Sequence, residues 1–329
     1  MMMENKNVRL WQQYQALYLH IPFCVQKCLY CDFASYAGFD EQVKREYTDA
    51  VCKEIALRAD EVANMAANAS IYFGGGTPSV LPTECIAKLV NALKRYGFWQ
   101  QPCEATIEVN PGTADLAKLQ TLRQLGFDRI SFGVQSLQDN ELWAIGRIHN
   151  AQQALEALAL ARKAGFARVS ADLIYGLPHQ TLEGWQKNLS AALDLTPEHL
   201  SCYGLKVEEG TPLFARRGTA GLPGDDAQAD MYLYMVEFLK AQGYEQYEIS
   251  NFARPGHASR HNLKYWTLGE YAGFGPGAYS DFGGVRYGYI RDLDRYIAGE
   301  LVLAESEHIP VSEREMEYIM PVSYTHLRA

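Results

Sequence analysis

The hydrophobic positions along the chain follow two alternating periods. Short runs rich in apolar, β-branched and aromatic residues recur six times, and segments of helical period lie between them. A strand–helix–strand order repeated in this way predicts an α/β fold with a parallel sheet and helices outside it. Six units fit either an open doubly wound sheet or a partial barrel. The predicted strands are 16–23, 70–75, 105–111, 129–136, 168–177 and 199–206.

The segments between the strands carry the apolar stripe of amphipathic helices. Asn150 with Gln153 three residues later has the pattern of a capping box, and Gly165 suits the end of the helix that this box begins. The clearest predicted helices are 40–62, 83–97, 151–165 and 226–242.

The regular alternation loosens after residue 207, where a Gly- and Pro-rich stretch begins. The last nine residues, PVSYTHLRA, follow abruptly on a well-patterned helix and resemble translated adapter sequence, so we exclude them from fold reasoning and expect a truncation at Met320. These features predict four segments, which are an N-terminal extension (1–15), a core domain (16–249), a truncated C-terminal domain (250–320) and an artefactual tail (321–329).

The composition is that of an ordinary globular protein, with 48% hydrophobic and 21% charged residues and a formal net charge of -9. An acidic balance without a Lys/Arg cluster argues against a nucleic-acid-binding surface. No apolar run reaches the roughly 18 residues of a transmembrane helix, and the N-terminus lacks the apolar region of a secretory signal. We therefore expect a cytoplasmic protein in a reducing environment.

Unusual small and polar residues follow the predicted strands. Cysteines come after the first strand, and GGGTPS, EVNPG and GVQS come at the ends of the next three. Because the carboxyl ends of parallel strands meet at one rim, these segments are expected to surround one ligand site. Glu108 and Asp172 fall within apolar strands, where a carboxylate is costly unless a partner compensates it.

Three of the seven cysteines, Cys24, Cys28 and Cys31, lie within eight residues in a C-x3-C-x2-C pattern. In a reducing compartment, clustered cysteines bind metal or do redox chemistry more often than they form disulfides. Four thiolates would close a structural zinc site, whereas three leave an open position, as in a [4Fe–4S] cluster with one available iron. A structural zinc protein stays an alternative, although no fourth ligand is evident nearby.

The C-x3-C-x2-C motif resembles that of the radical S-adenosylmethionine (SAM) superfamily. Together with YFGGGTPS, EVNPGT, SFGVQS, GRIHN and DLIYGLP, it makes the chain similar to the coproporphyrinogen-dehydrogenase-like branch, and most similar to the heme chaperone family. The resemblance runs from about Tyr18 to about Met320. It implies a partial (β/α)6 TIM-like barrel with the start of a smaller C-terminal domain.

The resemblance also implies a role for each matching position. Cys24, Cys28 and Cys31 would hold a [4Fe–4S] cluster whose open iron binds SAM. In the superfamily, an electron from the cluster cleaves SAM to methionine and a 5′-deoxyadenosyl radical. The motif leaves open whether this chain does so, and no catalytic residue is assigned. The implied SAM contacts are Tyr18, Gly75, Gly76, Thr77, Glu108, Gln135, Arg147 and Asp172. For Tyr18 and Arg147, a core aromatic and a lone surface arginine are the structural alternatives.

Two departures separate this chain from the dehydrogenase of the same branch. The dehydrogenase carries another cysteine shortly after the triad, where this chain has Asp32, Phe33 and Ala34. It also carries a longer N-terminal arm than the short segment that precedes the first strand here. Both differences favour a heme chaperone that delivers heme to hemoproteins, and oxygen-independent coproporphyrinogen III dehydrogenase stays the alternative.

A further element, H-N-x-x-Y-W, resembles the second signature of the heme chaperone family and spans His261 to Trp266. A neutral imidazole is a common axial heme ligand, and Tyr265 and Trp266 could pack on a porphyrin face. His261 is therefore the candidate ligand of a heme carried as cargo. The structural alternative is that His261 and Trp266 only brace the junction to the C-terminal region.

Overall fold

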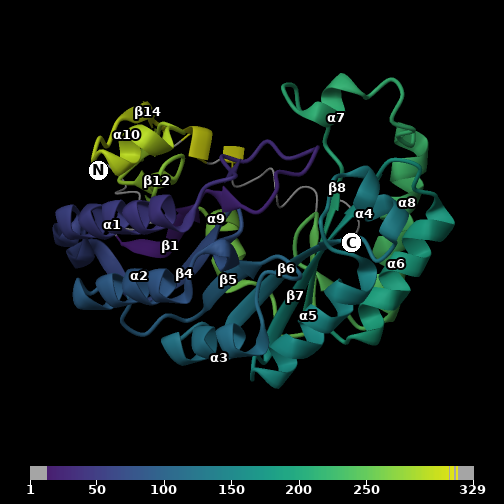
Figure 1. Ribbon diagram of the computed structural model, residues 1–329, viewed down its shortest axis with the longest axis horizontal. Helices are drawn as coiled ribbons and strands as arrows, with labels where there is room; N and C mark the ends of the chain where they lie inside the picture. Colours follow the sequence, from purple (N-terminus) through teal and green to yellow (C-terminus); the bar gives the residue numbers. More distant parts are fainter. Residues whose placement is uncertain (1–12, 311, 315, 318–329) are drawn as a thin grey trace, which may run out of the picture.

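The computed structural model describes residues 13–310, 312–314 and 316–317. Its centre is a curved, open sheet with helices packed on the outer side (Figure 1). Six parallel strands lie side by side in chain order, which confirms the predicted α/β fold. They are β1 (Tyr14–Ile21), β4 (Met65–Gly75), β5 (Ala105–Val109), β6 (Arg129–Gln135), β7 (Arg168–Tyr175) and β8 (His199–Gly204).

The helices that join these strands cover the outer face of the sheet (Figure 1). The predicted capping box is present, because the Asn150 side chain accepts from the Gln153 amide while the Gln153 side chain accepts from the Asn150 amide. Gly165, with a φ of +91°, follows the end of that helix. The helices are α1 (Glu41–Leu57), α2 (Thr83–Arg95), α3 (Leu116–Leu125), α4 (Asp139–Ala144), α5 (Ala151–Lys163), α6 (Leu182–Asp194) and α8 (Asp225–Ala241).

Side chains along each strand point alternately to the two faces of the sheet, so one set joins the hydrophobic core and the other faces the concave side. On β5, Ile107 is fully buried in the main hydrophobic core, whereas the next residue, Glu108, lines a cavity. On β6, Ile130 and Phe132 join the core, whereas Ser131 lines the same cavity. The helices thus cover the apolar side, and the concave side is left for polar residues.

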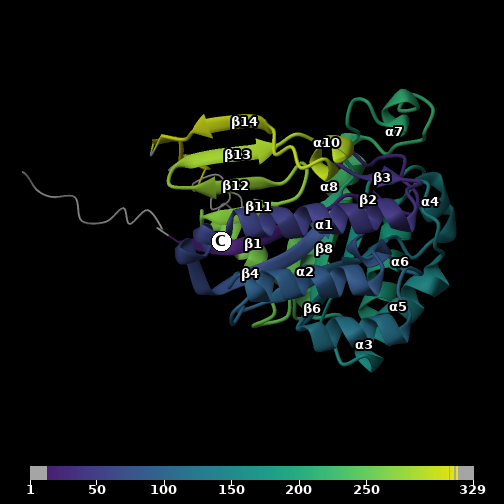
Figure 2. The same cartoon turned by 60° about the vertical axis from the view of Figure 1, so that its left-hand side comes forward.

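The chain after residue 250 adds strands to both edges of this sheet, which has twelve strands in all among the described residues. Figure 2 shows those at the edge beside β1. At one edge, β10 (Asn251–Ala253) pairs antiparallel with β8 and with β9 (Glu245–Gln246). At the other edge, β11 (Tyr271–Phe274) runs parallel to β1 and leads into the meander β12 (Tyr279–Phe282), β13 (Val285–Tyr289) and β14 (Leu303–His308). A domain boundary near residue 250 stays a prediction.

Short elements complete the fold. A two-stranded ribbon of β2 (Phe23–Cys24) and β3 (Tyr36–Ala37) flanks the cysteine loop. The remaining helices are α7 (Pro212–Ala215), α9 (Arg260–Trp266), α10 (Leu293–Ile297), and the 3-10 turns η1 (Ala59–Asn64) and η2 (Pro78–Val80). None of the helices in the described part of the chain could cross a membrane. The predicted tail, and all but the last residues of the predicted N-terminal extension, lie outside the described residues.

Candidate functional site

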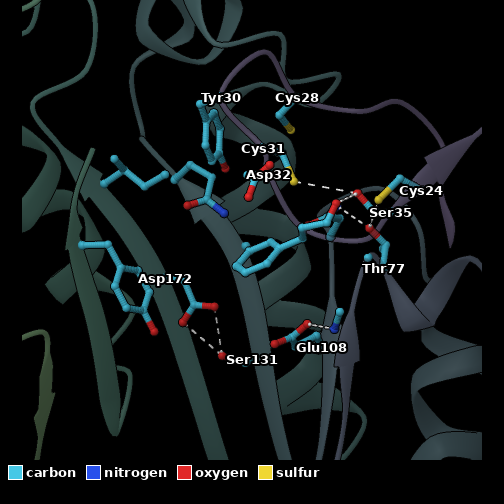
Figure 3. Close-up of a pocket in the computed structure, with 18 of the residues that line it drawn as sticks. Cys24, Cys28, Tyr30, Cys31, Asp32, Ser35, Thr77, Glu108, Ser131 and Asp172 are labelled. Carbon is cyan, nitrogen blue, oxygen red and sulfur yellow. Dashed lines mark hydrogen bonds between the residues drawn. The ribbon is translucent and has the colours of Figure 1, made fainter. Parts of the chain in front are cut away.

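A cavity of about 540 Å³ opens at the carboxyl ends of the parallel strands and continues into the concave side of the sheet (Figure 3). The cysteines lie at one end of it, and the carboxylates of Glu108 and Asp172 project into it from β5 and β7. The structure therefore gathers nearly all of the predicted rim residues around one space. Those that line it are Cys24, Cys28, Cys31, Gly75, Gly76, Thr77, Glu108, Gln135, Arg147 and Asp172.

Each of the three thiols has a polar side chain of the protein beside it. Cys24 Sγ lies 3.5 Å from Thr77 Oγ1, and Cys31 Sγ lies 3.8 Å from Ser35 Oγ. Cys28 Sγ accepts a hydrogen bond of 3.4 Å from Arg147 Nη1. Hydrogen bonds to cysteine sulfur stabilise the thiolate and tune the potential of an iron–sulfur centre.

The donor set fits an iron–sulfur cluster better than a single metal ion. Among the described residues, no three His, Cys, Asp or Glu side chains are spaced to bind one ion. A four-iron cluster bonds each thiolate to a different iron, so its ligands stand farther apart than those of one zinc ion. Three partly buried thiols around one cavity, with no fourth cysteine among the described residues that line it, match a cluster that keeps one iron open.

The glycine run after β4 packs against the backbone beside the cysteines. The amides of Gly76 and Thr77 donate to the carbonyls of Ile21 and Phe23, at 2.8 and 2.7 Å. A Cβ on Gly76 would stand 2.7 Å from the Phe23 carbonyl oxygen, closer than real Cβ atoms come. Gly76 therefore needs to lack a side chain so that the two backbone segments can approach each other. From the sequence, Gly76 was expected only to contact a ligand.

The two carboxylates of the cavity are buried, and among the described residues neither has an arginine or lysine ion-pair partner. Glu108 accepts from Tyr72 Oη at 2.7 Å and from the Gly75 amide at 3.1 Å, and burial raises the pKa of its carboxyl to about 7. Asp172 accepts from Ser131 Oγ at 3.0 Å, and burial raises its pKa as well. Two buried carboxylates of this kind favour a cationic ligand.

The raised pKa of Glu108 predicts a measurable pH dependence in the ligand-free protein. The folded carboxyl binds a proton that the unfolded one has released, so stability falls as pH rises from about 4.3 to about 7. Replacing Glu108 with glutamine removes this pH-dependent loss of stability, which is about 3–4 kcal/mol. Chemical unfolding at pH 5 and pH 8 should therefore show a gap between E108Q and the wild type that grows with pH in favour of E108Q. A gap that stays constant would show that Glu108 titrates normally.

Gln135 reaches the cavity from a strained turn at the end of β6, where its φ is +67°. A buried network on the outer side holds this turn. The Leu137 amide donates to Asn188 Oδ1 at 2.7 Å, and Ser136 Oγ donates to Glu141 at 2.6 Å. Glu141, only 2% exposed, also accepts from Gln180 and Asn188. Sequence reasoning missed Glu141, because its position in a short helix carries no periodic signal.

Arg147 links three parts of the rim and is not a lone surface residue. Besides Cys28, its guanidinium donates to Asn110 Oδ1 at 2.9 Å and to the Gly133 carbonyl at 2.5 Å. It therefore connects the cysteine loop with the ends of β5 and β6. This arrangement suits a residue that holds the mouth of the cavity in shape.

Tyr18 is the one predicted SAM contact that does not line the cavity. Its hydroxyl lies 3.0 Å from His20 Nδ1, and its ring lies beside Tyr72, with 6.2 Å between the ring centroids. It therefore supports the wall from behind. Contact between Tyr18 and a ligand stays a prediction.

The residues of the H-N-x-x-Y-W element have different surroundings. His261 is 1% exposed, its Nδ1 lies 2.9 Å from Ser70 Oγ, and its Nε2 lies 3.0 Å from Tyr265 Oη. In this arrangement neither ring nitrogen is free to bind a heme iron, and the ring stacks on Tyr72, which supports Glu108. Asn262 lines the main cavity, whereas Tyr265 and Trp266 line a separate outer cavity. This geometry favours the structural alternative for His261, and its role as heme ligand stays a prediction.

Several cavity residues were missed by sequence reasoning. Arg129 and Ser131 precede Gly133 and Gln135 at alternate positions of β6, so the period of two could have found them once the strand's inner face was known. Asn110 belongs to the EVNPG segment that the sequence singled out for its carboxylate. Tyr30, between the second and third cysteines, and Arg291, from the C-terminal meander, carry no such signal.

Comparisons with known proteins show which family the chain resembles in sequence and fold. Residues 18–191 match the model of the radical SAM superfamily. A heme chaperone HemW of Synechocystis is 40% identical over 85% of this chain and 69% of its own length, and that of Haemophilus influenzae is 37% identical over 93% and 81%. The solved structure of coproporphyrinogen III oxidase (HemN) from Escherichia coli, a radical SAM enzyme, superposes with a TM-score of 0.83 at 26% identity. That superposition covers 96% of this chain and 76% of the oxidase.

Proposed function

The chain belongs to the radical SAM superfamily and to the family of its curated heme chaperone relatives, and we propose from this that it binds heme and delivers it to hemoproteins. The observation that carries the choice is identity of 36–40% to several heme chaperones, against 26% to the oxidase. Asp32 and Phe33 after the triad, in place of a further cysteine, support the same choice. We propose that the protein carries out this function in the cytoplasm, where thiols stay reduced.

We propose that Cys24, Cys28 and Cys31 hold a [4Fe–4S] cluster. When bound, the cluster supplies one electron and an open iron on which SAM is held. The arginine at position 147 would then stabilise one thiolate through its hydrogen bond to Cys28 and keep the loop against β5 and β6. Thr77 and Ser35 would stabilise the other two thiolates in the same way, through their hydroxyl groups.

SAM is the proposed ligand of the cavity beneath these cysteines. Its sulfonium and amino groups are positive, and Glu108 and Asp172 supply the buried negative charges that such a ligand requires. Gln135 and the Gly75–Thr77 segment line the adjacent walls, and the Tyr72 hydroxyl orients Glu108. The protein's own task is to orient the ligand and to exclude water from it.

Heme titration tests the proposal directly. We expect saturable binding with a shifted Soret band, followed by loss of the shifted band from this protein when an apo-hemoprotein such as apomyoglobin is added. Retention of the shifted band with no heme passing to apomyoglobin, or the absence of saturable binding, would argue against a chaperone.

The His261→Gln variant tests whether this histidine is a heme ligand or a structural residue. Because both ring nitrogens are engaged inside the protein, we expect the Soret shift to survive and the midpoint of thermal unfolding to fall by several degrees. Loss of the Soret shift in a variant that still folds would instead assign the axial bond to His261.

A further inference from the structure

Phe33 is an exposed aromatic side chain at the mouth of the main cavity. It follows the cysteine triad on the loop between β2 and β3, lines the cavity, and is 67% exposed. Tyr203, near the end of β8, is 43% exposed and lines the same cavity. Among the described residues, these are the two large hydrophobic side chains that are both exposed and part of this lining. Open apolar surface gathered at one cavity marks a binding site.

Other parts of the cavity wall are apolar as well. Tyr30 and Leu205 line the cavity and pack against a small hydrophobic cluster of Ile145, Ile174 and Leu177. Tyr30 lies beside the cysteines, which places this wall at the same end of the cavity as the triad (Figure 3). The mouth therefore offers aromatic and aliphatic surface to a flat, apolar ligand.

Two cationic side chains contact the backbone at Phe33. Lys27 Nζ donates to the Phe33 carbonyl at 3.1 Å, and Arg291 Nη1 donates to the Asp32 carbonyl at 3.4 Å. Both cations are exposed and line the cavity. Among the described residues, neither forms an ion pair with a carboxylate. Their charges are therefore available to an anionic ligand that lies on the Phe33 ring.

The acidic side chains that line the mouth act on a third cation, Lys206. Glu208 forms an ion pair with it at 2.5 Å, and Glu208 first and Asp32 second raise the pKa of this lysine. Lys27 and Arg291 thus leave the mouth with an excess of positive charge, although the protein as a whole has a formal net charge of -9. A local excess of this kind attracts a negatively charged ligand to this part of the surface.

We infer that the mouth of the cavity is the heme site, where Phe33 stacks on the porphyrin face while Lys27 and Arg291 bind the propionates. A heme is flat and apolar on its faces and carries its carboxylates along one edge, so it matches an exposed ring beside two cations that lack acidic partners. The inner part of the cavity, with Glu108 and Asp172, is left for SAM. An open site also suits a chaperone, because an acceptor can reach the cargo.

The inference rests on the proposed function and assigns a place to the heme that this function requires. Recognition through the porphyrin face and the propionates does not need iron. Iron-free protoporphyrin IX should therefore bind saturably to the same site and compete with heme. Failure of protoporphyrin IX to compete would place recognition on the iron and overturn the inference.

The test measures dissociation constants for heme, heme dimethyl ester and SAM on the anaerobically reconstituted protein and its variants. We expect Phe33→Ala to weaken heme binding about 5- to 30-fold, whereas Phe33→Tyr keeps the ring and binds like the wild type. The double variant Lys27→Met/Arg291→Met should weaken heme binding about 10- to 100-fold and leave the uncharged ester unaffected. Cluster content and SAM affinity should stay at the wild-type values in all of these variants.

Trp143→Ala and Lys187→Met are the matched controls. Trp143 is 82% exposed, and Lys187 forms an exposed ion pair with Glu183 on α6; neither residue lines the cavity. Both variants should bind heme like the wild type. A loss in the controls as large as that in the mouth variants would show non-specific attraction of heme to the surface and would overturn the site.

The remaining outcomes separate the site from the function. Wild-type heme affinity in Phe33→Ala and in the double variant would overturn the inference and leave the chaperone function standing. An equal loss for heme and its ester in the double variant would show that Lys27 and Arg291 only support the loop. A loss of SAM affinity in Phe33→Ala as large as that for heme would assign the ring to SAM, and either of these results would also overturn the site. A wild-type protein that binds no heme would contradict the proposed function, and the inference with it.

Discussion

Replacing Cys24 with alanine is expected to reduce the iron and sulfide bound after anaerobic reconstitution to roughly a tenth of the wild-type value or less, since three thiolates are the whole protein ligand set proposed for the cluster. Cys24 stands at the end of β2, where its sulfur lies beside Thr77 and faces the cavity with Cys28 and Cys31. The broad charge-transfer absorption of the cluster should disappear with the metal.

Cys103→Ala is the matched control for this experiment. Cys103 is also a partly buried free thiol, but it lies before β5 and is not part of the cavity lining. We expect this variant to reconstitute like the wild type. Equal iron and sulfide in Cys24→Ala and in the control would refute the assignment of the cysteine triad to the cluster.

Replacing Arg58 with methionine is expected to lower the free energy of unfolding by about 3–5 kcal/mol, because it leaves the buried carboxylate of Glu54 and the partly buried one of Glu61 without their counter-ion. Arg58 is 7% exposed and donates to Glu54 Oε1 at 2.8 Å and to Glu61 Oε1 at 2.8 Å. It also donates to the carbonyl of Gly273 in β11 at 2.6 Å. Denaturant unfolding followed by circular dichroism measures the loss.

This network matters for the site because it joins α1 to the C-terminal meander. Glu54 accepts from the Gly275 amide at 3.0 Å and from Tyr296 Oη in α10 at 2.5 Å. The same meander brings Arg291 to the cysteine loop, where the Tyr36 hydroxyl donates to its carbonyl at 2.5 Å. Loss of Arg58 should therefore also loosen the cover over the cysteines.

Arg45→Met, within α1, is the control. Arg45 forms ion pairs with Glu41 and Glu84 on the exposed surface, where water screens the charges, so its loss should leave the unfolding midpoint nearly unchanged. An unfolding midpoint for Arg58→Met as close to the wild-type value as that of Arg45→Met would show that the buried network contributes little to stability.

The parallel sheet could be predicted from the sequence, because the signal for each of its strands lies within the strand itself and the turn that follows it. A run such as RISFGVQS fixes its own extended conformation through β-branched and aromatic residues, and the turn residues after it place its end. The strands therefore fell within a few residues of their predicted bounds, β4 excepted, which begins five residues earlier. That the motif residues meet at one rim could be predicted because the carboxyl ends of parallel strands lie at the same edge of the sheet.

The edges of the sheet could not be predicted in the same way. The strands β9, β10 and β11 are two to four residues long and depend on a partner strand already in place. Such short segments carry too few residues to show a period of two. Their positions are set by pairing with β8 and β1, which are distant in the sequence.

Two side chains have surroundings that form only in the folded chain and that the sequence could not show. His261 looks like a ligand in the sequence, yet Ser70 and Tyr265 occupy its ring nitrogens. Arg129 looks like the ordinary charged start of a strand, yet the fold buries it without an acceptor. In both cases the deciding information is which groups surround the side chain after folding.

The most direct test of a heme chaperone is one anaerobic experiment on the reconstituted protein, supplied with SAM, a reductant, and either heme or coproporphyrinogen III. The chaperone function predicts that heme binds saturably and that coproporphyrinogen III is recovered unchanged, with no decarboxylated product. Decarboxylation to protoporphyrinogen IX at a rate above that of the Cys24→Ala variant would contradict it and identify the protein as a dehydrogenase.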